Sequence, residues 1–123
     1  MGHDEKGGIY EKDKDNEARS ASTLETSLDD LSLFFQGVMQ KKIINSKYTN
    51  EVFSPQIRIR SVEQMGPLST RDTIANDAIQ LSCGLGFGLL KSPYGWGAFK
   101  EGHGDGFRHY VIIFQNPELV YSS

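Results

Sequence analysis

The predicted fold is decided by residues 84–114, which read GLGFGLLKSPYGWGAFKEGHGDGFRHYVIIF. Residues 108–115 are rich in β-branched and aromatic side chains, and residues 96–103 form a second strand-like run. The turn signal Pro93-Tyr94-Gly95 precedes them, and residues 79–90 predict one further strand whose glycines favour close packing or a bulge. Because the connections between these strands are short, we expect an antiparallel meander.

Upstream of this sheet, the sequence predicts one main helix. Thr26 or Ser27 can cap its first turn, and two aspartates follow where the helix dipole favours negative charge. Apolar residues recur at helical spacing, at Leu28, Leu31, Phe34, Phe35, Val38 and Met39. Residues 45–56 suggest a short helical turn, residues 57–60 a short strand and residues 61–78 a polar loop. The predicted fold class is α+β, a small antiparallel sheet of about three strands with one main packed helix.

Residues 1–22 are charged and lack periodicity, so they predict a flexible polar arm ahead of a folded part that spans residues 23–123. The net charge is only −3 and the basic residues form no cluster, which gives nucleic-acid binding no electrostatic support. No apolar run approaches the roughly 20 residues of a membrane span, and the N-terminus lacks the apolar segment of a signal peptide. The compartment is left open, with the cytoplasm as the default expectation. The single cysteine, Cys83, predicts a small core residue rather than a disulfide.

Residues 101–106, Glu-Gly-His-Gly-Asp-Gly, form the candidate site, because polar side chains alternate there with glycine. In an extended strand, residues two apart point the same way, so Glu101, His103 and Asp105 would share one face. The glycines would leave the backbone open to close approach. Trp96 could line a binding pocket beside these side chains, or it could belong to the core.

Two further interpretations of these residues stay open. Glu101, His103, Asp105 and His109 could bind zinc or a similar ion, although their spacing matches no strong metal signature. His103 and His109 could instead be ordinary solvated strand residues. No motif calls for a cofactor, since the glycines of residues 84–88 are not followed by the helix that a phosphate-binding loop needs.

Four short motifs resemble, in their order, the C-terminal part of the serine β-lactamase and penicillin-binding-protein-like superfamily, in its class C and esterase-like branch. Leu24-Glu-Thr-Ser-Leu-Asp-Asp-Leu-Ser-Leu-Phe34 is similar to the start of a family helix, and Phe53-Ser-Pro-Gln-Ile57 to a Ser-Pro-Gln segment. Cys83-Gly-Leu-Gly-Phe-Gly88 is similar to a Tyr-Gly-Leu-Gly-Trp-Gly strand, and His103-Gly-Asp105 to a Lys-Thr-Gly or His-Gly-Gly motif. The resemblance covers about residues 20–115 and implies a partial β-lactamase/transpeptidase-like fold.

The resemblance implies roles for two residues of the candidate site. In such hydrolases a Ser-x-x-Lys motif supplies nucleophile and base, while the Lys-Thr-Gly or His-Gly-Gly strand lines the pocket. His103 would take the pocket-lining position, and Gly106 would offer an N–H to an oxyanion hole. Asp105 departs from the pattern, because the family has glycine there. No serine of this chain has a lysine three residues later, so the nucleophile and its base are missing.

These features predict a chain without catalytic activity of its own. The first interpretation is a fragment or degenerate remnant of a serine β-lactamase-like hydrolase, because acyl transfer needs nucleophile, base and oxyanion hole within hydrogen-bond reach. The alternatives are a stand-alone binding or oligomerising module and a small metal-binding protein. Open edges of a small sheet favour pairing with another chain, so we expect self-association or association with a complementary N-terminal half.

Overall fold

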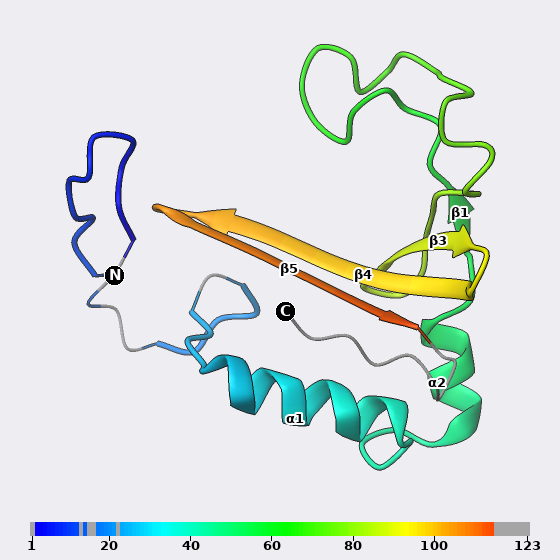
Figure 1. Cartoon of the computed structure of the whole chain (residues 1–123), viewed down its shortest axis with the longest axis horizontal. Helices are drawn as coiled ribbons and strands as arrows, with labels where there is room; N and C mark the ends of the chain where they lie inside the picture. The colour runs from blue at the N-terminus through cyan, green and yellow to red at the C-terminus, as the bar shows by residue number, and fades with distance from the viewer. Residues whose placement is uncertain (1, 13, 15–16, 22, 115–123) are drawn as a thin grey trace.

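The computed structural model describes residues 2–12, 14, 17–21 and 23–114. This part of the chain contains two helices and five strands: α1 (Leu28–Met39), α2 (Ser46–Val52), β1 (Ile57–Arg58), β2 (Ser82–Cys83), β3 (Gly88–Ser92), β4 (Gly95–Gly104) and β5 (Phe107–Phe114). The strands form one antiparallel sheet in which each pairs with its neighbour in the chain (Figure 1). The α+β class and the antiparallel meander are confirmed, whereas the expected three strands are too few.

Residues 79–90 contain a hairpin, and the prediction of a single strand there is wrong. Strands β2 and β3 pair antiparallel, with Cys83 opposite Gly88. The N–H of Gly84 donates to the carbonyl oxygen of Phe87 at 2.8 Å, and Gly86 has a φ of +86°. Since glycine adopts positive φ at little cost, the glycine-rich segment makes the turn between two strands.

The two longest strands, β4 and β5, form a second hairpin that extends beyond the predicted strand ends. The pairing runs up to Gly104 opposite Phe107, so that Asp105 and Gly106 make a two-residue turn. Gly106 has a φ of +73°, and Asp-Gly is a strong signal for such a turn. Gln115, the predicted end of the last strand, lies outside the described residues.

Helix α1 has defined caps at both ends. The Oγ of Ser27 accepts a hydrogen bond from the N–H of Asp30 at 3.1 Å, which selects Ser27 over Thr26 as the N-cap. At the other end the N–H of Lys42 donates to the carbonyl oxygen of Gly37 at 2.9 Å. Lys41 lies between them with a φ of 59°, the left-handed conformation in which glycine is the usual residue.

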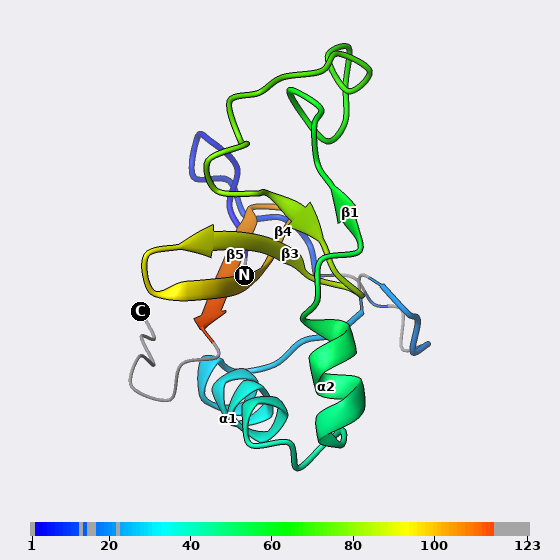
Figure 2. The ribbon, with the colours of Figure 1, turned by 90° about the vertical axis from the view of Figure 1, so that its right-hand side faces the viewer.

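The core lies between the sheet and the two helices, which occupy one side of it (Figure 2). Its buried hydrophobic residues are Val38 of α1, Phe53 after α2, Leu89 of β3 and Ala98 of β4, with Val52, Phe87, Trp96 and Ile113 partly buried against them. Leu89 and Ala98 are opposite each other in the β3–β4 register, so they mark the face that the helices cover. We call it the helix face, and the other side of the sheet the open face.

The described part of the predicted arm is locally folded. His3 and Ile9 form an antiparallel bridge, and the Oδ1 atom of Asp4 accepts hydrogen bonds from the N–H groups of Lys6 and Gly8 at 2.8 and 2.7 Å. Among the described residues, neither helix has the length and apolar character that crossing a membrane requires.

Candidate functional site

The register of β4 against β5 distributes the candidate site residues over both faces of the hairpin. Glu101 lies opposite Tyr110, and His103 lies opposite Arg108. Because opposite residues share a face, as do residues two apart in one strand, these four side chains lie on the open face. His109 follows Arg108 directly and therefore projects from the helix face. The shared face predicted for Glu101 and His103 is confirmed by this register.

Asp105 and Gly106 lie in the turn at the far end of the hairpin rather than in a strand. There the arm packs against the backbone: a Cβ atom at Gly106 would overlap the main chain of His3 and lie 2.8 Å from the carbonyl carbon of Gly2. A Cβ atom at Gly2 would likewise overlap the carbonyl oxygen of Asp105. The turn that would offer an oxyanion N–H is thus partly covered by the arm.

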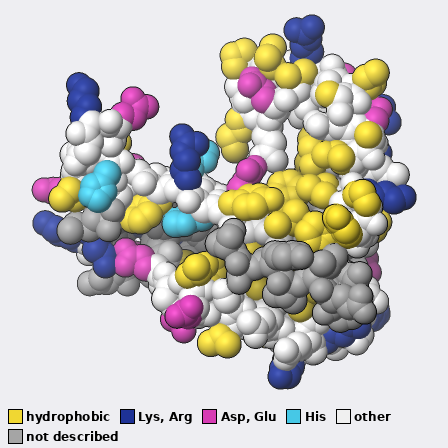
Figure 3. All heavy atoms as spheres, in the orientation of Figure 1, with side chains coloured by type: hydrophobic (Ala, Val, Ile, Leu, Met, Phe, Trp, Pro, Cys, Tyr) yellow, Lys and Arg dark blue, Asp and Glu magenta, His cyan; other side chains and the backbone are white. Residues whose placement is uncertain are grey.

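The outer half of the hairpin has no core beneath it. Every residue in the range 101–110 is exposed, whereas Gly97 and Ala98, nearer the base of β4, are buried. In Figure 1 the hairpin reaches away from the helices, and Figure 3 shows histidine and charged side chains at its outer end beside the arm. The exposure of His103 and His109 agrees with their interpretation as solvated strand residues.

The four residues of the metal alternative are not brought together. His109 lies on the opposite face from Glu101 and His103, and Asp105 lies in the turn. Within the described ranges, no three His, Cys, Asp or Glu side chains are grouped in a way that could hold a metal ion.

A pocket of about 310 Å³ lies at the base of the hairpin, where β4 meets the β2–β3 turn. Its lining residues are Gln64, Cys83, Gly84, Gly86, Phe87, Gly88, Phe99, Lys100 and Glu101. Gly88 lies opposite Phe99, and a Cβ atom at Gly88 would overlap the Phe99 ring. The outer end of the ring therefore lies over the glycine, and Phe99 gives the pocket an apolar wall. Of the predicted site residues, all of which the structure describes, Glu101 alone lines this pocket.

Sequence reasoning missed most of this pocket because it treated residues 79–90 as one strand. Cys83 was expected in the core, but it is exposed, since β2 directs it to the open face next to the turn. Trp96 is half-buried on the helix face and packs against the core, so it lies on the opposite side of the sheet from Glu101. No local sequence signal marks the pairing of Phe99 with Gly88, because it depends on the register between β3 and β4.

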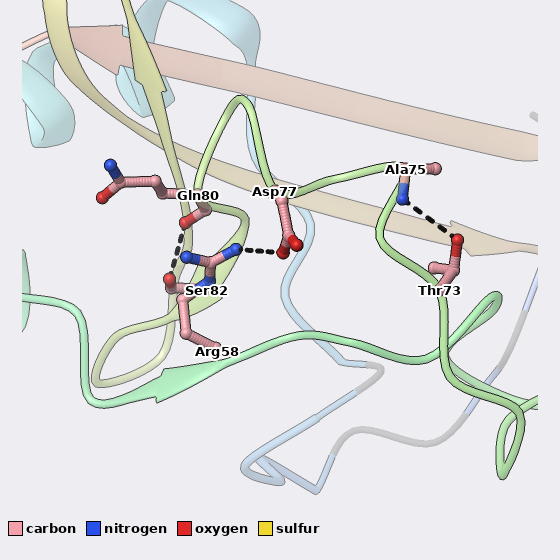
Figure 4. Close-up of polar contacts among 6 residues, drawn as sticks. All are labelled: Arg58, Thr73, Ala75, Asp77, Gln80 and Ser82. Carbon is pink, nitrogen blue, oxygen red and sulfur yellow. Dashed lines mark hydrogen bonds and ion pairs between the residues drawn. The ribbon is translucent and has the colours of Figure 1, made fainter.

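The loop that contributes Gln64 is fixed at its base by polar contacts (Figure 4). The guanidinium of Arg58 donates to Oδ1 of Asp77 at 2.9 Å, and the hydroxyl of Ser82 donates to the carbonyl oxygen of Gln80 at 2.7 Å. Ser82 is fully buried, so its hydroxyl needs a hydrogen-bond acceptor within the protein, and the carbonyl oxygen of Gln80 provides one. These contacts anchor the loop of residues 59–81 to β1 and β2 beside the pocket.

The lining residues offer binding groups rather than an acylating centre. They include a thiol, a carboxylate, an ammonium, an amide and two aromatic rings, but no histidine and no serine. No protein-family model, curated protein or solved structure matches this chain. The β-lactamase-like relationship therefore remains a prediction from the sequence motifs.

Proposed function

We propose that this chain is a non-catalytic relative of the serine β-lactamase-like hydrolases. It would retain the strands that line the pocket in that fold, but it lacks the nucleophile and the base for acylation. The observation that carries the proposal is the antiparallel pairing of β3 with β4. The glycine-rich segment of residues 83–88 leads into β3, and the strand with His103 follows as its antiparallel neighbour. The resemblance implies a strand for residues 83–88, whereas the structure makes them the β2–β3 turn, so the support rests on the pairing of β3 with the strand that carries His103.

Lack of catalysis follows from the side chains near these strands. The chain has no Ser-x-x-Lys motif, and Ser82, the serine of β2, is buried with its hydroxyl bound to the backbone. His103 is exposed, and Gly106 lies in a turn against the arm. Nucleophilic catalysis needs an activated nucleophile beside its base, and the described side chains provide no such pair around the pocket.

Hydrolysis of a chromogenic cephalosporin and of a p-nitrophenyl ester tests this proposal. We expect rates no higher than those of the buffer, and no difference between the native chain and the His103→Ala variant. His109→Ala is the matched control, because His109 is also exposed but lies on the other face. Turnover that is lost in His103→Ala and kept in His109→Ala would overturn the non-catalytic assignment.

A stand-alone binding module is the second candidate, and the pocket at the base of the hairpin favours it. Its volume of about 310 Å³ lies at the lower end of the range of small-molecule sites. The Phe99 ring would contact an apolar group of a ligand, with the Glu101 carboxylate at the rim. Amide NMR shifts of Gly86 and Gly88 on addition of a fragment mixture, lost in Phe99→Ala, would support this function; an unresponsive pocket would exclude it.

A further inference from the structure

Strand β5 is a long and poorly protected edge of the sheet. In the described part of the chain, β4 is the one strand that pairs with it, and this pairing runs unbroken from Phe107 to Phe114. In an antiparallel sheet, every second residue of an edge strand directs its N–H and C=O groups away from the strand it pairs with, so these groups are free to bind another strand. Natural edges are usually blunted by lysine, proline or a bulge. β5 reads FRHYVIIF, with Arg108 as its single Lys, Arg, Asp or Glu and with no proline.

The opposite edge of the sheet is different. Strand β1 contains only Ile57 and Arg58, and the chain continues from it into the loop that Asp77 anchors. A two-residue edge offers another strand too few hydrogen bonds to define a register. Residues 100–104 of β4 also extend past the end of β3, but Lys100 and Glu101 protect that stretch, so β5 is the long described edge without such charges.

The chain also exposes far more surface than a compact monomer of its size. Its accessible surface is 9987 Å², whereas a compact protein of 13.7 kDa has about 6,600 Å². Part of this difference belongs to exposed side chains of β5, which are free for a second chain to cover. Tyr110 of β5 is 66% exposed, and Ile112 and Phe114 are only half-buried on the open face.

We propose that two copies of this chain associate by antiparallel pairing of their β5 strands about a twofold axis, which joins two five-stranded sheets into one. Such an axis stands perpendicular to the sheet, so the open faces of both copies become continuous. With Val111 on the axis, Tyr110 opposes Ile112 of the partner subunit, and Arg108 opposes Phe114 of the partner subunit. No like charges face each other in this register, whereas a pairing centred on Arg108 would place two guanidinium groups together.

Light scattering coupled to size-exclusion chromatography tests the assembly. The native chain is expected to elute with a mass of about 27 kDa, twice its 13.7 kDa. Tyr110→Lys is expected to weaken dimerisation at least about tenfold, because it places a lysine on each of the pairing strands. Tyr94→Lys is the matched control, since Tyr94 is equally exposed at 66% but lies in the β3–β4 turn, and this variant should keep the native mass. A native chain that is monomeric at about 100 µM, or a dimer that Tyr110→Lys leaves unchanged, would refute the proposal.

Disulfide cross-linking tests the geometry. Single cysteines are introduced at each position of the range 109–113 in a Cys83→Ser background and oxidised, with circular dichroism as the check on folding. A twofold β5 pairing predicts that the yield peaks at one position and falls on both sides of it, because only the residue on the axis meets its own copy at disulfide distance. Equal yields at every second position would instead indicate packing of the two open faces and would overturn the edge pairing. Both tests read association rather than turnover, so they are independent of the proposed relation to hydrolases.

Discussion

Leu89 and Leu90 are neighbours in β3 that point to opposite faces of the sheet, and replacing each by alanine tests which face carries the core. Leu89 is 1% exposed and packs among Val38, Phe53 and Ala98. Truncation to alanine removes three carbon atoms from the core. Each buried carbon contributes about 0.8 kcal/mol of hydrophobic free energy, so their loss alone costs about 2.4 kcal/mol of stability. The neighbouring side chains fill the vacated space only in part, and the remaining cavity adds to the loss. We therefore expect Leu89→Ala to lower the free energy of unfolding by about 3 kcal/mol. Leu90 is half-buried on the open face, so Leu90→Ala should cost about 1 kcal/mol or less.

Urea unfolding followed by circular dichroism and by Trp96 fluorescence measures both losses, because Trp96, the single tryptophan, packs against the same core. The samples are kept dilute, so that association does not contribute to the stability. If Leu89→Ala does not fold, Leu89→Met serves instead, with an expected cost below about 1.5 kcal/mol. If Leu90→Ala lowers the free energy of unfolding as much as Leu89→Ala, or more, the helices cover the other face of the sheet. The assignment of both faces would then be wrong.

Three further substitutions test local features of the fold by the same urea assay. Lys41→Gly should raise stability by about 1 kcal/mol, because glycine adopts the left-handed conformation after α1 without strain; a loss would contradict that geometry. Gly106→Ala should cost about 1–2 kcal/mol, and deleting residues 2–10 should reduce this cost, since only the positive φ would then oppose alanine. Asp77→Asn should cost less than about 1 kcal/mol, and least at high salt, because the side chains of Arg58 and Asp77 are 34% and 51% exposed.

The parts of the fold that could be predicted from the sequence are those with strong local signals. Helix α1 combines a capping serine, two aspartates and an apolar stripe, and its bounds agree with that pattern. The β-branched run of β5 is equally clear. Strands β1 and β2 could not be predicted with correct bounds, because each has two residues and is defined by pairing between Ile57 and Cys83, which are distant in the chain. A period of two cannot be recognised in a strand of that length.

The candidate site shows a similar division between what lies within one strand and what depends on pairing. Alternation along β4 correctly placed Glu101 and His103 on one face. The face of His109 depends on the length of the turn before it: a turn with an even number of residues, here two, places His109 on the face opposite to His103. Asp105 was expected to continue the strand, although Asp105-Gly106 is itself the turn signal. The pocket could not be predicted, because it requires the glycines of one hairpin to lie against Phe99 of the next.

We propose that Glu101 and His103, which lie on an uncovered hairpin, serve contact with a second chain rather than catalysis. A catalytic group has to be held within about 0.5 Å of its working geometry by side chains that pack around it. Both residues are exposed, and the strand that carries them lies outside the core formed by Leu89 and Ala98. An exposed hairpin bends easily and cannot supply that precision by itself. The same exposure suits a surface that a second chain covers, because pairing along β5 would add a neighbour to the hairpin and restrict its motion. The outer half of the hairpin should therefore gain protection from amide hydrogen exchange as the protein concentration rises, and protection that is independent of concentration would contradict this role.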